Sequence, residues 1–386
     1  MPISQTPGSG PQQHFPELDG IRGLAILGVL CSHGAGLSGL FDPSHHYSIA
    51  DKLVRYASVP LWGGVDLFFV LSGFLITGIL LRTKSSENYF SSFYVRRVLR
   101  IFPIYYLVLT VSLIIAHFST GFATQLPPWP SWRFAYFIYL QNWPIFWHGE
   151  KMMGSLWGAY WSLAIEEQFY FIWPLVIAFF PEKTVARICY IGLACALPLR
   201  IFLALHYFQG SFGLAQMTSS RVDGLFVGAT CAIYLFQHKK PVPKRWIIAS
   251  ASIGLIIMGY IAAFHHNELV GTSYWMTTVG ITGFALLSGA LVAIAPHQIK
   301  FINRVLNLGW LRLTGKYSYG MYVYHLFIFV SFRDLGNRTG ILSRLNFPER
   351  MLSLLLEMAA IFVAAKISYD LYESRFLRLK RYFKSQ

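Results

Sequence analysis

Ionisable side chains lie within long apolar stretches of this 386-residue chain, and two of them share a stretch. Arg22 and His33 are eleven residues apart. At ~100° per residue, eleven helical steps end within ~20° of the starting face, so both side chains would project from one side, ~16 Å apart along the axis. A guanidinium binds anions, and an imidazole exchanges protons near neutral pH. The pair could hold an anionic carrier at one end and move a proton at the other, and we expect both residues to face one water-accessible cavity.

Three arginines, Arg96, Arg97 and Arg100, form a second candidate at the start of an apolar run. The spacing of Arg97 and Arg100 puts both on one face of a helix. Guanidinium groups bind phosphate through two parallel hydrogen bonds, which favours a phosphate-binding site. Basic residues beside a membrane span can also serve only to orient it. Both interpretations remain open.

The carboxylates form a third group. Glu166 and Glu167 are adjacent and would point to different sides of a helix, so at least one should face a partner or a cavity, because an ionised group facing lipid is costly. Arg221 and Asp223 are possible partners. The other ionisable residues predicted at membrane depth are Asp66, His117, Arg200, His206, His325, Glu357, Lys366 and Asp370.

The composition predicts the elements that must position these groups. The chain is 55% hydrophobic and 13% charged, whereas a soluble domain carries about 25% charged residues. Ten apolar runs have the length that crosses hydrocarbon, roughly 16 to 22 residues. We therefore expect an all-α integral membrane protein, a bundle of about ten transmembrane helices. The runs are 23–40, 61–81, 101–118, 158–180, 188–207, 222–238, 246–264, 275–295, 317–332 and 351–372. Trp132 to Trp147 is predicted to be interfacial or re-entrant.

Charge predicts the orientation. The net charge is +15, and the cations gather in short clusters between apolar runs, which favours cytoplasmic loops over nucleic-acid binding. An N-in, C-in topology puts most Lys and Arg in the cytoplasm, although the loop 333–350 goes against the trend. We expect a polar N-terminal segment over 1–16, a transmembrane domain over 17–373 and a basic cytoplasmic tail over 374–386. No cleaved signal peptide is predicted.

The sequence does not predict a metal site or a disulfide. The four cysteines lie within apolar runs without metal-ligand spacing. The pairs His45–His46 and His265–His266 lie in loops without a companion carboxylate pattern, and we interpret them as solvated.

Taken together, the motifs make the chain similar to the acyltransferase-3 family of bacterial membrane O-acyltransferases. The matching segments run in the family's order across nearly the whole chain. They are Leu-Asp-Gly-x-Arg at 18–22 with His33, Phe-Phe-Val-Leu-Ser-Gly-Phe at 68–74, Arg-Arg-x-x-Arg at 96–100 with Pro-x-Tyr-Tyr at 103–106, Trp-Ser-Leu-x-x-Glu-Glu-Gln-Phe-Tyr at 161–170, Arg-x-Asp-Gly at 221–224 and Ser-Tyr-Gly-x-Tyr-x-x-His at 318–325. The hydrolase-like extracytoplasmic domain of some members is not found, so a two-domain relay within this chain is not expected.

The resemblance implies an acyl-CoA donor, usually acetyl-CoA, that enters from the cytoplasm, and a cell-surface carbohydrate or glycolipid acceptor. It also implies that Arg22 and His33 belong to the essential site and that the arginine cluster is a second basic motif. We expect a multi-pass protein of the bacterial cytoplasmic (inner) membrane. Lipopolysaccharide, exopolysaccharide, a nodulation-type oligosaccharide and an antibiotic are all compatible acceptors.

The hypothesis for the reaction is acyl transfer from a thioester to a hydroxyl. His33 would act as the base or carry the acyl group transiently, and Glu166 or Asp19 would orient its ring. Arginines would hold donor phosphates or stabilise the oxyanion. The catalytic candidates are His33, Arg22, Glu166 and Asp19; the donor-binding candidates are Arg96, Arg97, Arg100 and Ser72; the supporting candidates are Asp66, Arg221, Asp223 and His325.

Two other functions remain open at this point. Ten spans with buried charges also suit a proton-coupled secondary transporter, although no inverted repeat is visible. A non-catalytic membrane partner of a polysaccharide assembly complex would have a similar composition.

Overall fold

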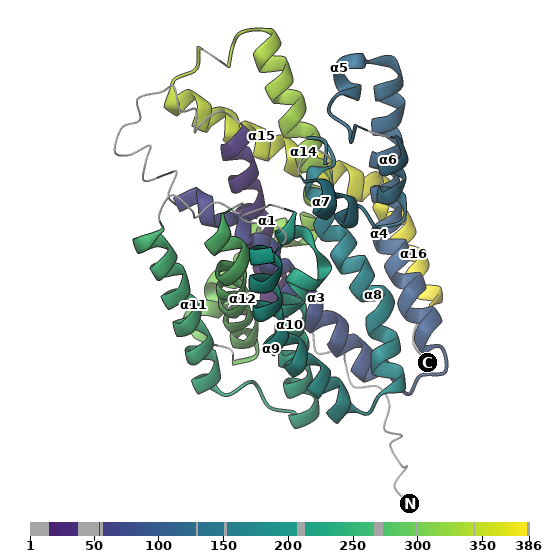
Figure 1. The fold of residues 1–386 in the computed structure, drawn as a ribbon. Helices are drawn as coiled ribbons and strands as arrows, with labels where there is room; N and C mark the ends of the chain where they lie inside the picture. The colour runs from purple at the N-terminus through teal and green to yellow at the C-terminus, as the bar shows by residue number, and fades with distance from the viewer. Residues whose placement is uncertain are drawn as a thin grey trace, which may run out of the picture.

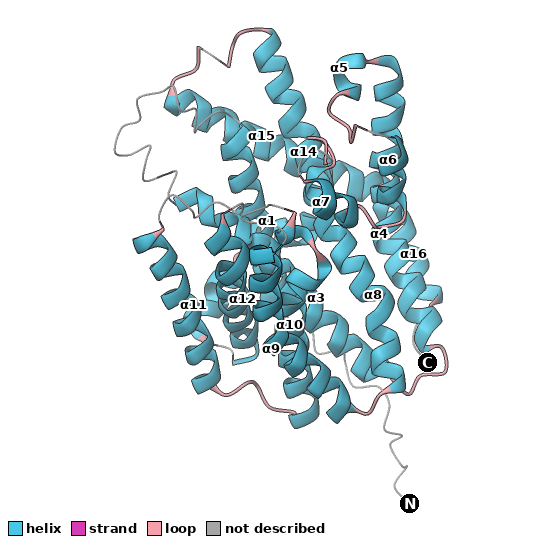
Figure 2. Cartoon of the chain, viewed as in Figure 1, coloured by secondary structure: helices cyan, strands magenta, loops and turns pink. Residues whose placement is uncertain are grey.

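The computed structural model describes residues 15–37, 54, 57–128, 130–149, 153–206, 213–265, 273–297, 299–342 and 344–383. Within these ranges every regular element is helical (Figure 2). This is what hydrocarbon requires, because a helix satisfies its backbone hydrogen bonds within one segment. His45, His46, His266 and residues 1–14 of the predicted N-terminal segment lie outside the described residues.

Long helices form the body of the molecule (Figure 1). They are α1 Pro16–Leu37, α3 Gly64–Thr83, α4 Tyr89–Phe118, α8 Trp161–Phe179, α9 Glu182–His206, α10 Thr218–His238, α11 Lys244–Phe264, α12 Ile281–Ile294, α14 Gly309–Arg338 and α15 Phe347–Ser368. Short pieces connect them or lie at their ends: η1 Val59–Gly63, α5 Thr120–Ala123, α6 Pro130–Phe137, α7 Asn142–His148, η3 Gly158–Tyr160, η4 Leu214–Gln216, η6 Met276–Gly280, η7 Ala295–His297, α13 Lys300–Leu306, η8 Tyr369–Glu373, α16 Ser374–Leu379 and η9 Lys380–Tyr382.

Eight helical stretches among the described residues are long and apolar enough to cross a membrane. They contain α1, α3, α4, α8, α9, α11, α12 and α15. The other two predicted runs, 222–238 and 317–332, lie in α10 and α14, which are also long but carry more polar residues. The segment Trp132 to Trp147 forms α6 and α7, of eight and seven residues. Neither is long enough to cross a bilayer, as we predicted.

Glycines let α3 and α10 approach closely. A Cβ atom built on Gly73 of α3 would lie 2.0 Å from the carbonyl oxygen of Leu225, and one built on Gly228 of α10 would lie 2.0 Å from the carbonyl oxygen of Val70. Backbone therefore meets backbone on both sides of this interface, as in other membrane helix pairs that small residues join.

Glycines also let α1 and α14 approach closely. A Cβ atom on Gly315 of α14 would lie 1.8 Å from the carbonyl oxygen of Asp19, and one on Gly23 of α1 would lie 2.2 Å from that of Leu311. These backbone contacts lie on both sides of Arg22 in the sequence. They therefore fix the rotation of α1 about its own axis and, with it, the direction of the Arg22 side chain.

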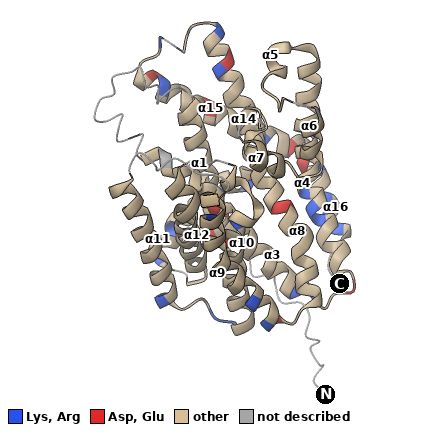
Figure 3. Cartoon of the chain, in the orientation of Figure 1, with Lys and Arg blue, Asp and Glu red and all other residues tan. Residues whose placement is uncertain are grey.

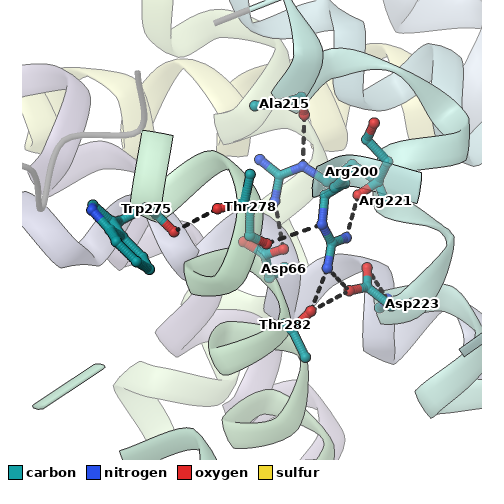
Figure 4. A network of polar contacts seen from close by, with 10 residues as sticks. Asp66, Arg200, Ala215, Arg221, Asp223, Trp275, Thr278 and Thr282 are labelled. Atoms are coloured by element: carbon teal, nitrogen blue, oxygen red, sulfur yellow. Dashed lines mark hydrogen bonds and ion pairs between the residues drawn. The ribbon is translucent and has the colours of Figure 1, made fainter. Parts of the chain in front are cut away.

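Two ion pairs cross the interior between α3, α9 and α10 (Figure 4). Arg221 Nη1 lies 2.6 Å from Asp66 Oδ1, and Arg200 Nη2 lies 2.8 Å from Asp223 Oδ2. All four side chains are at most 4% exposed. Arg221 and Asp223 therefore pair with Asp66 and Arg200 and not with Glu166 or Glu167, so that prediction was wrong. Sequence indicates the face on which a charge lies but not the helix that this face meets.

Further hydrogen bonds satisfy the two guanidinium groups. Arg221 Nε donates to the carbonyl oxygen of Ala215 at 2.7 Å. Arg200 donates to the carbonyl oxygens of Thr278 and Ser220, at 3.0 and 2.6 Å, and to the hydroxyl of Thr282. A buried charge is tolerated when its partners are this complete. The pairs join four segments, α3, α9, α10 and the η6–α12 helix, around one polar centre.

We expect Gly73→Leu to destabilise the protein strongly, because a side chain at this position meets the backbone of α10 rather than a flexible neighbour. Gly259→Leu is the matched control, since no atom lies within 4 Å of a Cβ atom built on Gly259. Thermal unfolding of the two variants in detergent compares them directly. Equal unfolding temperatures would contradict the close packing of α3 on α10.

We expect Arg221→Met and Asp66→Leu to lower the unfolding free energy by about 3–5 kcal/mol each, because each leaves an unpaired buried charge. The double variant should be less damaging than the sum of the two, since no charge is left behind. Unfolding of all three variants in detergent measures this coupling. Strictly additive losses would show that the two side chains do not act as a pair.

Candidate active site

A strongly basic cavity of about 290 Å³ lies between the start of α1, the last turns of α3 and the start of α4. Six cations and one carboxylate line it: Arg22, Arg82, Arg96, Arg97, Arg100, Lys380 and Asp19. Figure 3 shows basic residues gathered along α16 and beside it on α4. A cavity with this imbalance of charge favours an anionic ligand that carries several negative charges.

Arg22 lies on this outer cavity together with Asp19. Arg22 Nη1 donates to Asp19 Oδ1 at 2.5 Å, and both side chains are 24% exposed. Asp19 therefore orients the guanidinium. It does not orient His33, because the two residues are fourteen positions apart in one continuous helix, ~21 Å along its axis.

The arginines of α4 meet Arg22 from the opposite side of the cavity. Arg96, Arg97 and Arg100 all line the outer cavity. Arg97 lies over the rings of Phe93 and Tyr170, with its Cζ atom 5.6 and 5.1 Å from the two centroids. Two segments more than seventy residues apart in sequence thus bring their predicted basic residues to one place.

A second, inner cavity of about 210 Å³ continues from the first. Arg22, Arg97 and Arg100 line both cavities. The inner cavity adds hydroxyl groups and a carboxylate, from Ser72, Ser162, Glu166, Tyr170 and Tyr322. On α3 the two cavities together are lined from Val65 to Thr83, which is ~27 Å of helix at 1.5 Å per residue. The combined space is long and narrow, basic at its mouth and less charged within.

Glu166 faces the inner cavity, and its neighbour Glu167 is not among the lining residues. Ser72 Oγ donates to Glu166 Oε1 at 2.5 Å and lies 2.9 Å from Tyr170 Oη. The expectation that at least one of the paired carboxylates faces a cavity therefore holds for Glu166. Glu166 lines the inner cavity together with Arg22, Arg97 and Arg100, whereas His33 does not line it.

His33 lies deeper along α1 and, unlike Arg22, is not among the lining residues of either cavity, so the expectation that both face one of these cavities was wrong. Its Nδ1 is 3.2 Å from the carbonyl oxygen of Val29. A carbonyl oxygen only accepts, so Nδ1 donates and the lone pair of neutral His33 is on Nε2. The main chain of α1 thus orients the ring, in the place that we expected a carboxylate to take.

His325 of α14 packs against His33, with 5.0 Å between the ring centroids. Its Nδ1 donates to the carbonyl oxygen of Tyr322 at 2.6 Å. The side chain is buried, and its Nε2 has no hydrogen-bond partner within the described part of the chain. Two imidazoles in the same tautomer therefore lie side by side at membrane depth.

Tyr322 lines the inner cavity and packs against His325. Its ring centroid lies 5.3 Å from that of His325 and 6.2 Å from that of Phe68. Its hydroxyl is 2.5 Å from Ser162 Oγ and donates to the carbonyl oxygen of Ala159 at 2.7 Å. The Tyr322 ring thus lines the inner cavity and also contacts His325, which packs against His33.

The supporting candidates Asp66, Arg221 and Asp223 belong to the ion-pair network described above. Arg221 also lies over the ring of Trp161, 5.2 Å from its centroid, which ties the network to the start of α8. These residues therefore hold the wall of the inner cavity and do not line it.

Sequence reasoning missed several cavity residues, among them Arg82, Lys380, Tyr170 and Tyr322. The aromatic residues stood within the quoted motifs, while Arg82 and Lys380 are ordinary basic residues at span ends. The four cysteines are free. Across the described ranges, no cluster of three His, Cys, Asp or Glu side chains is arranged to hold a metal ion.

Comparison with known proteins identifies a protein family that matches this chain. A family model described as an acyltransferase domain matches residues 15–369. The peptidoglycan O-acetyltransferase OatA of Listeria monocytogenes is 26% identical over 383 residues, covering 94% of this chain and 56% of that protein. The O-acetyltransferase OatA of Staphylococcus aureus is 27% identical over 336 residues, covering 82% and 51%. The putative peptidoglycan O-acetyltransferase YrhL of Bacillus subtilis is 25% identical over 352 residues, covering 84% and 50%.

The chain thus spans about half the length of these curated relatives. No solved structure matches it. The family model covers nearly the whole chain and includes Arg22, His33, the arginines of α4 and both cavity carboxylates, Asp19 and Glu166. The chain belongs to the acyltransferase-3 family.

Proposed function

We propose that this protein is a membrane O-acyltransferase that moves an acyl group, acetyl in the first instance, from acyl-CoA to a hydroxyl of a cell-surface carbohydrate. The observation that carries the proposal is the two-part cavity, in which a mouth lined by six cations leads to an inner end of hydroxyls and one carboxylate. Coenzyme A has a matching shape, with a polyanionic nucleotide at one end and a flexible, uncharged thioester arm at the other. The names of the relatives support an acetyl group and a cell-wall acceptor.

We further propose that α10 and α14 also cross the bilayer, giving ten spans, with both termini in the cytoplasm of a bacterial cell. The start of α1, the end of α3 and the start of α4 meet at the basic outer cavity, to which the C-terminal segment contributes Lys380. Phe15, at the start of the described chain, and Lys380, near its end, both line this cavity. Positive charge at one end supports a cytoplasmic location for that end. Acyl-CoA would then enter directly from the cytoplasm.

In this proposal Arg22, Arg97 and Arg100 hold the donor where the two cavities meet. Three guanidinium groups from α1 and α4 suit the diphosphate of coenzyme A, because each can donate two hydrogen bonds to phosphate oxygens. With the diphosphate at this position, the thioester arm extends into the inner cavity toward Ser162 and Tyr322.

The acceptor would approach His33 from the other side of the membrane. His33 is seventeen residues from Pro16, so it lies ~25 Å along α1 from the basic end, close to the thickness of the hydrocarbon. Its side chain is half-buried, so it is not sealed within the bundle. Passage of the thioester beyond the Tyr322 ring would bring its carbonyl carbon to His33.

His33 would activate the acceptor. Nε2 takes the proton of the acceptor hydroxyl while that oxygen attacks the thioester carbonyl, so the new C–O bond forms and the C–S bond breaks. The proton on the imidazolium then passes to the leaving thiolate, giving free coenzyme A. A transient acyl group on His33 would use the same Nε2 lone pair.

We expect His33→Ala to lower acyl transfer by at least about 10²-fold, since a general base typically contributes 10²–10⁴-fold. His206→Ala is a close control, because His206 has the same Nδ1 contact with a carbonyl oxygen four residues earlier but is exposed on α9. Transfer of radiolabelled acetyl from acetyl-CoA to surface carbohydrate is measured in membrane vesicles, with insertion checked for both variants. Retained turnover in His33→Ala would refute the role of His33, and accumulation of intact solute without transfer would indicate a transporter.

We expect Arg100→Ala to raise the KM for acetyl-CoA by about tenfold, since one charge-assisted hydrogen bond to phosphate is worth roughly 1.4 kcal/mol. Arg187→Ala removes the same charge from the exposed start of α9, away from the cavity, and should leave the KM unchanged. Initial rates at varied acetyl-CoA concentration separate KM from kcat. An equal KM in both variants would remove the arginines of α4 from donor binding.

A further inference from the structure

Lys380 lines the outer cavity although it lies beyond residues 15–369, which the family model matches. It comes from the C-terminal segment Ser374–Tyr382, which forms α16 and η9. We propose that Lys380 binds the 3′-phosphate of the acyl-CoA donor and that this segment is part of the donor site. The inference rests on the proposed function, because it assumes that acyl-CoA occupies the cavity.

The C-terminal segment is fastened at the mouth of the cavity. Ser92 Oγ, in the first turns of α4, donates to the carbonyl oxygen of Phe383 at 3.0 Å, and Ser92 itself lines the cavity. α16 packs against α4. Lys380 is half-buried, while its neighbours Arg378 and Arg381 are exposed. The segment that we predicted to be a plain basic tail therefore directs one of its basic side chains inward.

The positive charge at the mouth of the outer cavity favours the binding of an anionic ligand. Within the described ranges, Arg96, Arg97, Arg100 and Lys380 form no ion pair, and Asp19 is the one carboxylate among the lining residues. Like charges this close together repel, and bound phosphate would offset the repulsion. Arg82 is held differently, since its guanidinium lies 4.6 Å from the centroid of the Phe236 ring.

The order of cations along the cavity matches the order of phosphates along coenzyme A. From the thioester outward, the donor carries the pantetheine arm, then the diphosphate, then the ribose with its 3′-phosphate. Arg22, Arg97 and Arg100 line both cavities and so lie nearer the thioester end. Arg82, Arg96 and Lys380 line the outer cavity only. The shared arginines therefore suit the diphosphate, and the outer cations suit the 3′-phosphate.

The test compares two donors, acetyl-CoA and 3′-dephospho-acetyl-CoA, in the full chain and its variants. Lys380→Ala should raise the KM for acetyl-CoA by about five- to tenfold with little change in kcat, and should leave the KM for the dephosphorylated donor unchanged. Lys380→Arg keeps the charge and should retain most of the affinity. Arg378→Ala removes an equal charge from the same C-terminal segment without touching the cavity and should behave as the wild type.

Each remaining outcome overturns the inference. An unchanged KM in Lys380→Ala would exclude the contact, and an equal rise with both donors would place Lys380 on another part of the donor. The same rise in Arg378→Ala would reduce the effect to surface charge. If the wild type transferred no acetyl from acetyl-CoA, the proposed function itself would fail and Lys380 would lose its ligand. Size-exclusion profiles in detergent confirm that the compared variants are folded.

Discussion

The high free energy of a charge in a low-dielectric interior governs where this chain can place its ionisable groups. At the junction of α3, α9 and α10, each arginine has its own aspartate and a set of carbonyl and hydroxyl acceptors. At the mouth of the outer cavity, four cations lie together without carboxylate partners among the described residues. In the first arrangement each charge has a buried counter-charge, so the arrangement needs no ligand. The second is stable only with access to water or to an anion, and this difference separates structural arginines from ligand-binding ones.

The helix packing brings the second arrangement about. Glycines at Gly73 and Gly228 remove the space between α3 and α10, and Gly315 does the same between α14 and α1. With these interfaces closed, the open volume remains on the side of α3 that faces α4 and α8. Arg22 and the α4 arginines project into that volume from opposite walls. The family motifs are thus parts of one geometry, in which some residues bring helices together and others line the space that is left.

Features that depend on local sequence, such as the helices, were predicted well. Every predicted run overlaps a helix of the described residues, and Arg97 and Arg100 line the same cavity, as their spacing on one side of α4 predicted. Contacts between segments that are distant in the sequence could not be predicted. Asp66 and Arg221 are 155 residues apart, and periodicity says nothing about which of ten helices a given face meets. For the same reason the place of Tyr322 at the inner cavity and beside His325 was not predicted, since it depends on how α14 packs against its neighbours. Lys380 is outside every motif and belongs to the site only because the segment that follows α15 packs against α4.

The inner cavity is bounded at its far end by Tyr322, whose hydroxyl is tied to Ser162 and to the main chain at Ala159. In the proposed reaction the spent coenzyme is too highly charged to follow its acyl group past this ring. It must leave by the opening through which it entered, so acyl-CoA and free coenzyme A compete for the same opening. The rate of modification at the cell surface would then depend on the ratio of acylated to free coenzyme A inside the cell. Acylation outside the membrane would thus reflect the supply of acyl-CoA inside, although the coenzyme itself never crosses the membrane.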